Sequence, residues 1–207
     1  MTTIICVVSL FIWWNSQRSN SFSWTDNEIR ILQSLAIDKL PPLAKDHSNK
    51  VADNPNAAEF GRHLFFDERF SHNSKVSCAT CHIPELYFTD GLITAAGAQA
   101  GIRNTPTLVG AAYSPWQFWD GRSDSQWSQA LAPLENKREH AASRTQFAHT
   151  VFEDNNYRTR YESLFGPIPD FSDYQRFPAA AAPVDDKILN EAWQSMTAED
   201  RETVTAV

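Results

Sequence analysis

The sequence predicts an all-α domain in which helices are joined by long ordered loops. Apolar residues recur at helical spacing behind helix-start signals, and no stretch shows the alternation of a half-buried strand. Residues 83–122 are rich in Gly, Pro, Thr and Asn, which is typical of a long loop. The length of 207 residues suffices for one sizeable domain, and 42% apolar residues can supply its core.

Two helices are expected before the central motif. The first spans residues 24–40, opens with a capping box formed by Thr25 and Glu28, and stops at a Pro-Pro pair. The second opens at Asn54, has proline in its first turn, and ends near Phe66.

Later helices are expected from start signals at Ser123, Ser143 and Asn156. Residues 166–184 contain four prolines and an alanine run and are predicted to be a surface excursion. A last start signal, at Thr197, is followed by only ten more residues. It favours a chain cut short within a helix, with a short frayed terminal helix as the alternative.

The N-terminus carries an apolar run, residues 4–14, that is short for a membrane span and typical of an export signal. The run has no basic flank and no small-x-small cleavage site, so a retained membrane anchor or a buried element are the alternatives. We expect residues 1–22 to be a signal peptide or anchor, residues 23–207 to be the folded domain, and the location to be periplasmic.

The formal net charge of −7 predicts no nucleic-acid-binding surface, which needs clustered Lys and Arg. An acidic surface can instead steer a basic protein partner towards the domain. Of three cysteines, one lies in the N-terminal apolar run, so no disulfide framework is expected.

The most specific motif is the run from Cys78 to His82, which reads Cys-Ala-Thr-Cys-His. In c-type haem attachment two thiols at this spacing add across the porphyrin vinyl groups, and the adjacent histidine binds the iron. A zinc site would need a second pair of ligands, and a thioredoxin-like redox pair would need a βαβ context. Neither context is visible, so the motif predicts one covalent haem c held by Cys78 and Cys81, with His82 as iron ligand.

The ligand at the second axial position of the haem iron determines whether the haem transfers electrons or catalyses a reaction. Only Met1 and Met196 are methionines, which favours an open position, where peroxide can bind, over a methionine-ligated carrier. A monohaem electron carrier that uses one of the five remaining histidines as sixth ligand, with His72 and His140 the best placed, is the alternative.

Peroxide cleavage also needs a group that moves a proton between the two oxygens, and Glu139 is a candidate, near Pro133 and Gln129. Read alone, Glu139 is more often a solvated helix-flanking acid and Gln129 an exposed helical residue. Trp119 is a candidate electron relay, although a tryptophan is more often a core residue.

Together these residues resemble the bacterial dihaem cytochrome c peroxidases and their MauG-type relatives. The resemblance covers roughly residues 24–206 and is specific in order as well as content. The matching segments are GRHLFFDERFS at 61–71, CATCH at 78–82, FTDG at 88–91, RNTPT at 103–107 and FWDGR at 118–122, with Gln129, Pro133 and Glu139 at matching spacing.

The resemblance implies a cytochrome c-like helical fold, a periplasmic location and often a homodimer. It assigns the CATCH segment to the N-terminal, peroxidatic haem and places Gln129, Pro133 and Glu139 in its distal pocket, with Glu139 as the acid/base. It matches Trp119 to the tryptophan between the two haems. It matches Asn104 to a ligand of an interdomain calcium, of which this chain would supply only part.

Two departures modify these expectations. Where many family members present a haem-capping histidine, the matching stretch, residues 97–101, reads Gly-Ala-Gln-Ala-Gly. A five-coordinate haem that needs no reductive activation is therefore expected. The second CxxCH of the family is missing from these 207 residues, which predicts that the chain is an N-terminal half.

The expected function is therefore that of half a peroxidase. The whole enzyme would reduce hydrogen peroxide to water with electrons from a small cytochrome c or cupredoxin. A MauG-like maturase that oxidises a partner protein and a monohaem electron-transfer cytochrome are the alternatives.

Overall fold

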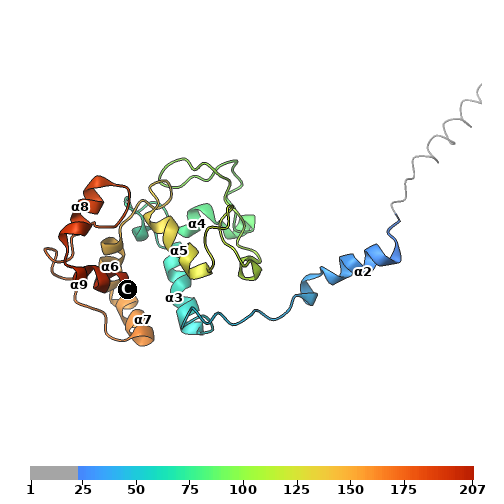
Figure 1. Cartoon of the computed structure of the whole chain (residues 1–207), viewed down its shortest axis with the longest axis horizontal. Coiled ribbons are helices and arrows are strands. Elements are labelled where there is room, and N and C mark those ends of the chain that lie inside the picture. The colour runs from blue at the N-terminus through green and yellow to red at the C-terminus, as the bar shows by residue number, and fades with distance from the viewer. Residues whose placement is uncertain (1–22) are drawn as a thin grey trace, which may run out of the picture. The chain divides into compact units, whose positions relative to one another are not determined.

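The computed structural model describes residues 23–207, and all regular structure in this range is helical apart from three isolated bridges. The predicted all-α class with long loops is confirmed (Figure 1). The expected signal or anchor, residues 1–22, lies outside the described residues. Within residues 23–207 no helix has the length and apolar character that a membrane span requires.

The described residues before Ala44 belong to a unit of their own, with helix α2 (Asp26–Ser34) and a 3-10 turn (Ile37–Lys39). The predicted capping box is present, since the Thr25 hydroxyl accepts from the Glu28 N–H and the Glu28 carboxylate accepts from the Thr25 N–H. The single helix expected over 24–40 is wrong, because the backbone becomes extended at Ala36. The apolar side chains here are exposed, so no packing holds a longer helix together.

The second unit, Ala44–Val207, carries the remaining helices. These are α3 (Pro55–Phe66), α4 (Cys78–Cys81), α5 (Gln126–Glu135), α6 (Arg144–Glu153), α7 (Asn155–Phe165), α8 (Lys187–Ser195) and α9 (Ala198–Thr205), with 3-10 turns at Glu68–Phe70, Pro84–Leu86 and Ala111–Tyr113. Between Leu86 and α5 the chain is a long loop, as expected.

The predicted helix starts are correct in part. Asn54 caps α3, Ser143 caps α6, and Thr197 caps α9, which runs for eight residues. The cap of α5 is Ser125 rather than Ser123, because the Ser125 hydroxyl accepts the Ser128 N–H. Asp154 caps α7 in place of Asn156, since its carboxylate accepts two N–H groups of the first turn.

Two hydrophobic clusters hold the second unit together. In the first, α3 packs against α7; its buried members are Phe60, Phe70, Val151, Tyr157 and Tyr161. In the second, α6, α8 and α9 meet the segment before α8; its buried members are Ala148, Phe171, Phe177, Ala181, Trp193, Met196 and Val204. Helix α6 contributes to both clusters, so it joins the α3 side of the unit to the C-terminal helices (Figure 1).

The expectation that residues 166–184 are a surface excursion is wrong. Phe171 and Ala181 are 0% exposed and Phe177 is 1% exposed, so this segment forms the centre of the second cluster. The prolines prevent a helix, yet an irregular chain can still bury its apolar side chains when its polar backbone groups find partners. One such partner is Thr145, whose hydroxyl accepts the Ala181 N–H at 2.7 Å.

Candidate haem-attachment site

The two thiols lie at the two ends of the single-turn helix α4. Cys78 and Cys81 are both free and partly buried, and their i, i+3 spacing places them on one face of the turn. The turn is closed at its start by Thr80, whose hydroxyl accepts the Ser77 N–H at 2.9 Å. Burial raises the pKa of the Cys78 thiol to about 11 and shifts that of Cys81 in the same direction, so both thiols keep their protons at neutral pH.

His82 follows directly and is held by one ring nitrogen. Its Nδ1 lies 3.0 Å from the carbonyl oxygen of Phe88. A carbonyl only accepts, so Nδ1 carries the hydrogen and Nε2 of the neutral ring offers a lone pair. A second hydrogen bond of this kind is how proteins usually orient a metal-binding imidazole.

A strained turn delivers the Phe88 carbonyl to His82. Tyr87 and Phe88 are consecutive non-glycine residues with φ of 56° and 59°. The Ile83 carbonyl accepts from the N–H of Phe88 at 2.9 Å, and the Tyr87 carbonyl accepts from the Thr107 hydroxyl. Such strain is maintained only where surrounding bonds fix it, and it is common at functional sites.

This donor set fits a c-type haem. Two free thiols stand one helical turn apart, and an imidazole oriented through its Nδ1 follows them. In the described part of the chain, no group of three or more His, Cys, Asp or Glu residues could hold a bare metal ion.

Glu139 lies close to the attachment helix. It ends a turn after α5, where Asn136 Nδ2 donates to Glu139 Oε1 at 2.6 Å and the Glu139 N–H donates to the Asn136 carbonyl. Burial raises the pKa of Glu139, although Arg122 and the Asn136 bond oppose the shift. The Glu139 charge in turn contributes to the raised pKa of both Cys78 and Cys81, so the carboxylate lies near the two thiols, as does the neighbouring His140.

Two further predicted pocket residues lie on α5. Gln129 and Pro133 are four residues apart and partly buried, so they share one face of the helix. The Pro133 carbonyl accepts the His140 N–H at 3.1 Å, which brings the chain after Glu139 back alongside the end of the helix.

His140 is buried at the edge of the same site. Its Nδ1 lies 3.0 Å from the Phe70 carbonyl and its Nε2 lies 3.9 Å from Cys78 Sγ. Both ring nitrogens therefore have neighbours already. The His72 side chain is exposed, and its backbone N–H donates to the His140 carbonyl at 3.0 Å.

Trp119 and Asn104 are joined to each other. Trp119 Nε1 donates to the Asn104 carbonyl at 2.8 Å, and the indole is 62% exposed. Trp119 is therefore not the core residue that its type alone favours. The Asn104 side-chain nitrogen donates to the Leu92 carbonyl, which leaves the side-chain oxygen as the atom that could bind a cation.

Sequence reasoning missed three participants of this site. Asn136 and Arg122 act on the Glu139 carboxylate, and Phe88 orients His82 through its backbone. The position of Asn136, three residues before Glu139, could have indicated the hydrogen bond between their side chains. A backbone carbonyl leaves no signal in the residue type.

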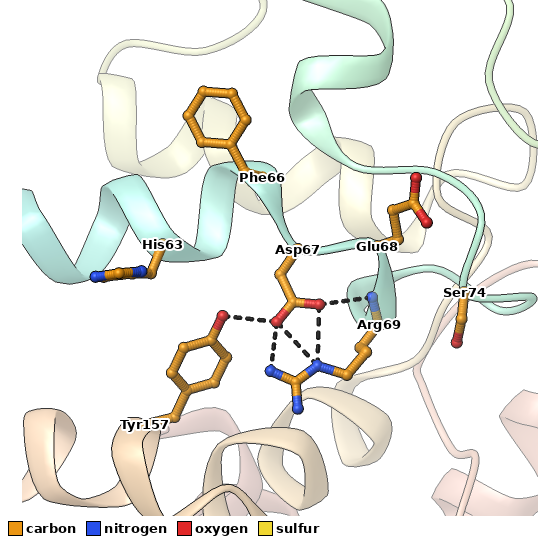
Figure 2. Close-up of a pocket in the computed structure, with 7 residues that line it drawn as sticks. All are labelled: His63, Phe66, Asp67, Glu68, Arg69, Ser74 and Tyr157. Carbon is orange, nitrogen blue, oxygen red and sulfur yellow. Dashed lines mark hydrogen bonds and ion pairs between the residues drawn. The ribbon is translucent and has the colours of Figure 1, made fainter.

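An open depression of about 460 Å³ lies elsewhere, around Asp67, Arg69 and Tyr157 (Figure 2). Tyr157 donates to the Asp67 carboxylate at 2.6 Å, and Arg69 pairs with Asp67 at 2.6 Å and with Asp154 at 2.9 Å. These polar groups are satisfied by one another and tie α3 to α7. None of the predicted site residues lines the depression.

The helical fold and the donor set of Cys78, Cys81 and His82 fit a c-type haem protein. A family model described as di-haem cytochrome c peroxidase matches residues 55–194. The chain belongs to the di-haem cytochrome c peroxidase family. The resemblance seen in the sequence is thus confirmed.

Individual relatives are similar over part of their length. The cytochrome c551 peroxidase of Nitrosomonas europaea is 35% identical over 116 residues, which cover 55% of this chain and 35% of that protein. The methylamine utilization protein MauG of Paracoccus denitrificans is 39% identical over 157 residues, which cover 65% of this chain and 40% of that protein. The chain thus spans 35% to 40% of the length of these two curated relatives.

Solved structures agree on the fold. A MauG-like protein associated with microbial copper homeostasis matches with a TM-score of 0.56 at 24% identity, over 69% of this chain and 40% of that one. The diheme peroxidase BthA from Burkholderia thailandensis matches with a TM-score of 0.51 at 22% identity, over 74% and 39% respectively.

Proposed function

We propose that this chain is the peroxidatic, haem c-binding half of a periplasmic dihaem peroxidase that reduces hydrogen peroxide to water. The observation that carries the proposal is the proximity to Cys78 and Cys81 of Glu139, an acid whose pKa is raised by burial and whose neighbour His140 lies 3.9 Å from Cys78 Sγ. One covalent haem is expected in this chain, with electrons supplied by a small cytochrome c or cupredoxin. The net charge of −7 supports a donor with a basic face.

Each residue has a separate role in the reaction. Cys78 and Cys81 would hold the porphyrin and His82 Nε2 would hold its iron, while the Phe88 carbonyl fixes the ring. When bound, the haem supplies the redox-active iron at which peroxide is reduced. The overall change consumes one hydrogen peroxide, two electrons and two protons, and it releases two waters.

Glu139 acts as the acid–base group of the proposed reaction. Its carboxylate takes the proton from one peroxide oxygen and returns it to the departing oxygen, which then leaves as water. A raised pKa suits this task, because acid–base catalysis is most effective when the pKa of the group approaches the working pH. Asn136 holds one carboxylate oxygen, so the other is free to face peroxide. Gln129 and Pro133, on one face of α5, would complete this wall of the pocket.

Asn104 and Trp119 would serve the junction with the second haem domain. The Asn104 side-chain oxygen would contribute one ligand to a shared calcium, and Trp119, exposed and bonded to Asn104, would lie on the electron path between the haems. A homodimer of the complete protein is part of the same proposal.

The test uses the chain produced together with a cytochrome c assembly system. Mass spectrometry should show one haem attached to the peptide that contains Cys78 and Cys81. In single-turnover mixing with hydrogen peroxide, Glu139→Gln should slow the haem absorbance change by about 10²-fold or more. Glu191→Gln, at an exposed carboxylate on α8, is the matched control and should react like the parent. No attached haem, or an unchanged rate in Glu139→Gln, would contradict the proposal.

Oxidative maturation of a partner protein is a second candidate, favoured by two exposed indoles. Trp116 and Trp119 are 61% and 62% exposed, so both are accessible for electron withdrawal from a docked protein. Peroxide-dependent oxidation of a partner's side chains that is lost in Trp119→Phe would support this function. Rapid steady-state turnover of the complete protein with reduced cytochrome c would favour the peroxidase instead.

A further inference from the structure

Residues 95–103 form a loop that contacts the Glu139 segment and that is closed by hydrogen bonds of its own. The Ala95 N–H donates to the Arg103 carbonyl at 2.9 Å, and the Gly101 N–H donates to the Ala95 carbonyl at 2.7 Å. A bridge between Ala96 and Ala100 closes the same turn. The loop tip, residues 97–100, is therefore a preformed surface of backbone groups.

This loop tip forms hydrogen bonds with Arg138 and Glu139. The Ala98 N–H donates to the Glu139 carbonyl at 2.7 Å, and the Gln99 N–H donates to the Arg138 carbonyl at 3.0 Å. In return, Arg138 Nη1 donates to the Ala100 carbonyl at 2.8 Å. Three hydrogen bonds thus join two segments that are about forty residues apart in the sequence.

Only glycine fits at the start of this contact. A Cβ on Gly97 would stand 2.6 Å from the Arg138 carbonyl oxygen and 2.8 Å from Glu139 Cα. Both obstacles are backbone atoms, so a side chain could be accommodated only if the two segments moved apart. The requirement at Gly97 is space, since its φ lies outside the left-handed region.

We propose that Gly97 and the backbone of residues 98–100 form a clamp that positions Glu139, with Arg138 as its side-chain fastener. Glu139 lies in the irregular turn between α5 and α6, where backbone order depends on such tertiary bonds. Asn136 holds one carboxylate oxygen, whereas the clamp fixes the main chain from which the carboxylate projects. The clamp is inferred as a positioning device for the proton-transfer role above and so depends on the proposed function.

The first experiment replaces Gly97 with alanine in the haem-loaded chain. Amide hydrogen exchange at Ala98 and Gln99 should accelerate, because their acceptors are pushed away. The rate constant for the peroxide reaction should fall by about 10- to 100-fold, the usual scale for a catalytic group displaced by about an ångström. Gly61→Ala is the matched control, since a Cβ at Gly61 meets nothing within 4 Å, and it should change neither quantity.

A pH profile separates positioning from general loss of structure. Burial raises the pKa of Glu139, so a loosened, more hydrated carboxylate should titrate closer to its ordinary value. The acid limb of the peroxide rate in Gly97→Ala should therefore move to lower pH while its plateau drops. A variant that was merely less folded would lose plateau with no movement of the limb, and this outcome would overturn the clamp.

Arg138 gives a second, milder variant in case Gly97→Ala does not fold. Arg138→Gln should weaken the bond to the Ala100 carbonyl and lower the peroxide rate, and Arg138→Lys should restore part of it. Equal rates in the parent and Arg138→Gln, with unchanged exchange at Ala98 and Gln99, would refute the clamp. A Glu139→Gln variant that reacts like the parent would refute the proposed function instead, and the exchange data would still decide whether the clamp exists.

Discussion

The C-terminal helices and the loop of residues 83–122 are built on different principles. In the C-terminal part, Phe171 and Phe177 are 0% and 1% exposed and sit at the centre of an apolar cluster. In the loop, Ile93 is 93% exposed, Ile102 is 73% exposed and Trp119 is 62% exposed. One region is stabilised by buried apolar surface, and the other is shaped mainly by hydrogen bonds.

The bonds of the loop are local and specific. Thr105 donates to the buried Asp90 carboxylate at 2.9 Å, Asn104 to the Leu92 carbonyl, and Thr107 to the Tyr87 carbonyl. Each such bond contributes only about 1 kcal/mol net, so the loop is expected to be the less stable region. The molecule thus combines a packed scaffold with a loop that hydrogen bonds shape.

Loss of haem attachment should have the largest effect and should separate the two regions. In Cys78→Ala with Cys81→Ala, no covalent haem can form, so the free energy of its binding no longer stabilises the fold. Amide exchange should accelerate across residues 83–122 by far more than in α6 to α9. Hydrogen-exchange mass spectrometry of the parent and the double variant measures this difference. Equal acceleration in both regions would show that they unfold as one unit.

Shortening a buried side chain in the packed C-terminal part should have the next largest effect. Phe177→Ala should lower the free energy of unfolding by about 3–5 kcal/mol, because it removes a buried ring and leaves a cavity. Its haem spectrum should match that of the parent below the melting temperature. Chemical denaturation gives the stability change, and Phe66→Ala, at a ring that is 50% exposed, is the control with a smaller expected loss. Similar losses in the two variants would contradict the scaffold assignment.

The smallest expected effect is the pH dependence of the stability that Asp67 contributes between α3 and α7. Burial alone would raise the pKa of Asp67, but hydrogen bonds from Arg69 and Tyr157 outweigh it and lower the pKa below the ordinary 3.8 (Figure 2). A lowered pKa stabilises the fold above pH 3.8, and this contribution is lost as the pH falls through the pKa of the folded state.

Asp67→Asn should therefore be less stable than the parent near neutral pH, and the difference should shrink below about pH 4. Thermal unfolding at a series of pH values gives the comparison. The control is Asp53→Asn, at an exposed carboxylate, which should follow the parent throughout. A difference between Asp67→Asn and the parent that stays constant down to pH 2 would exclude the ionised network as its cause.

Much of the scaffold could be predicted from the sequence, because local chemistry determines it. Asn54 and Ser143 start helices since their side chains cap the first N–H groups, whatever the rest of the fold does. The same local signals at Ser123 and Asn156 competed with Ser125 and Asp154 close by, and spacing alone could not rank them. Helix α8 was missed although Asp186 caps it, whereas the buried segment before it was misjudged because its irregular backbone shows no apolar period.

The candidate site likewise has features that local sequence reveals and features that depend on the fold. The attachment motif is local and could be read directly. Glu139 was a candidate from the need for a proton-transfer group, the resemblance assigned it the acid/base role, and its charge acts on both thiols in the structure. The contact of Gly97 with the Glu139 backbone depends on a fold-level approach of two loops, and a glycine in a loop is no signal by itself. The carbonyl of Phe88 is invisible for a similar reason, since every residue has one.

Electron paramagnetic resonance of the ferric, haem-loaded chain tests the central claim most directly. Residues 97–101 contain no histidine, and both nitrogens of His140 lie next to other groups; these observations predict a high-spin, five-coordinate ferric signal. That result, without prior reduction, would support a peroxide-accessible site beside Glu139. A low-spin signal with two strong axial ligands would contradict the peroxide-accessible site, because a second ligand would then occupy the position where peroxide has to bind.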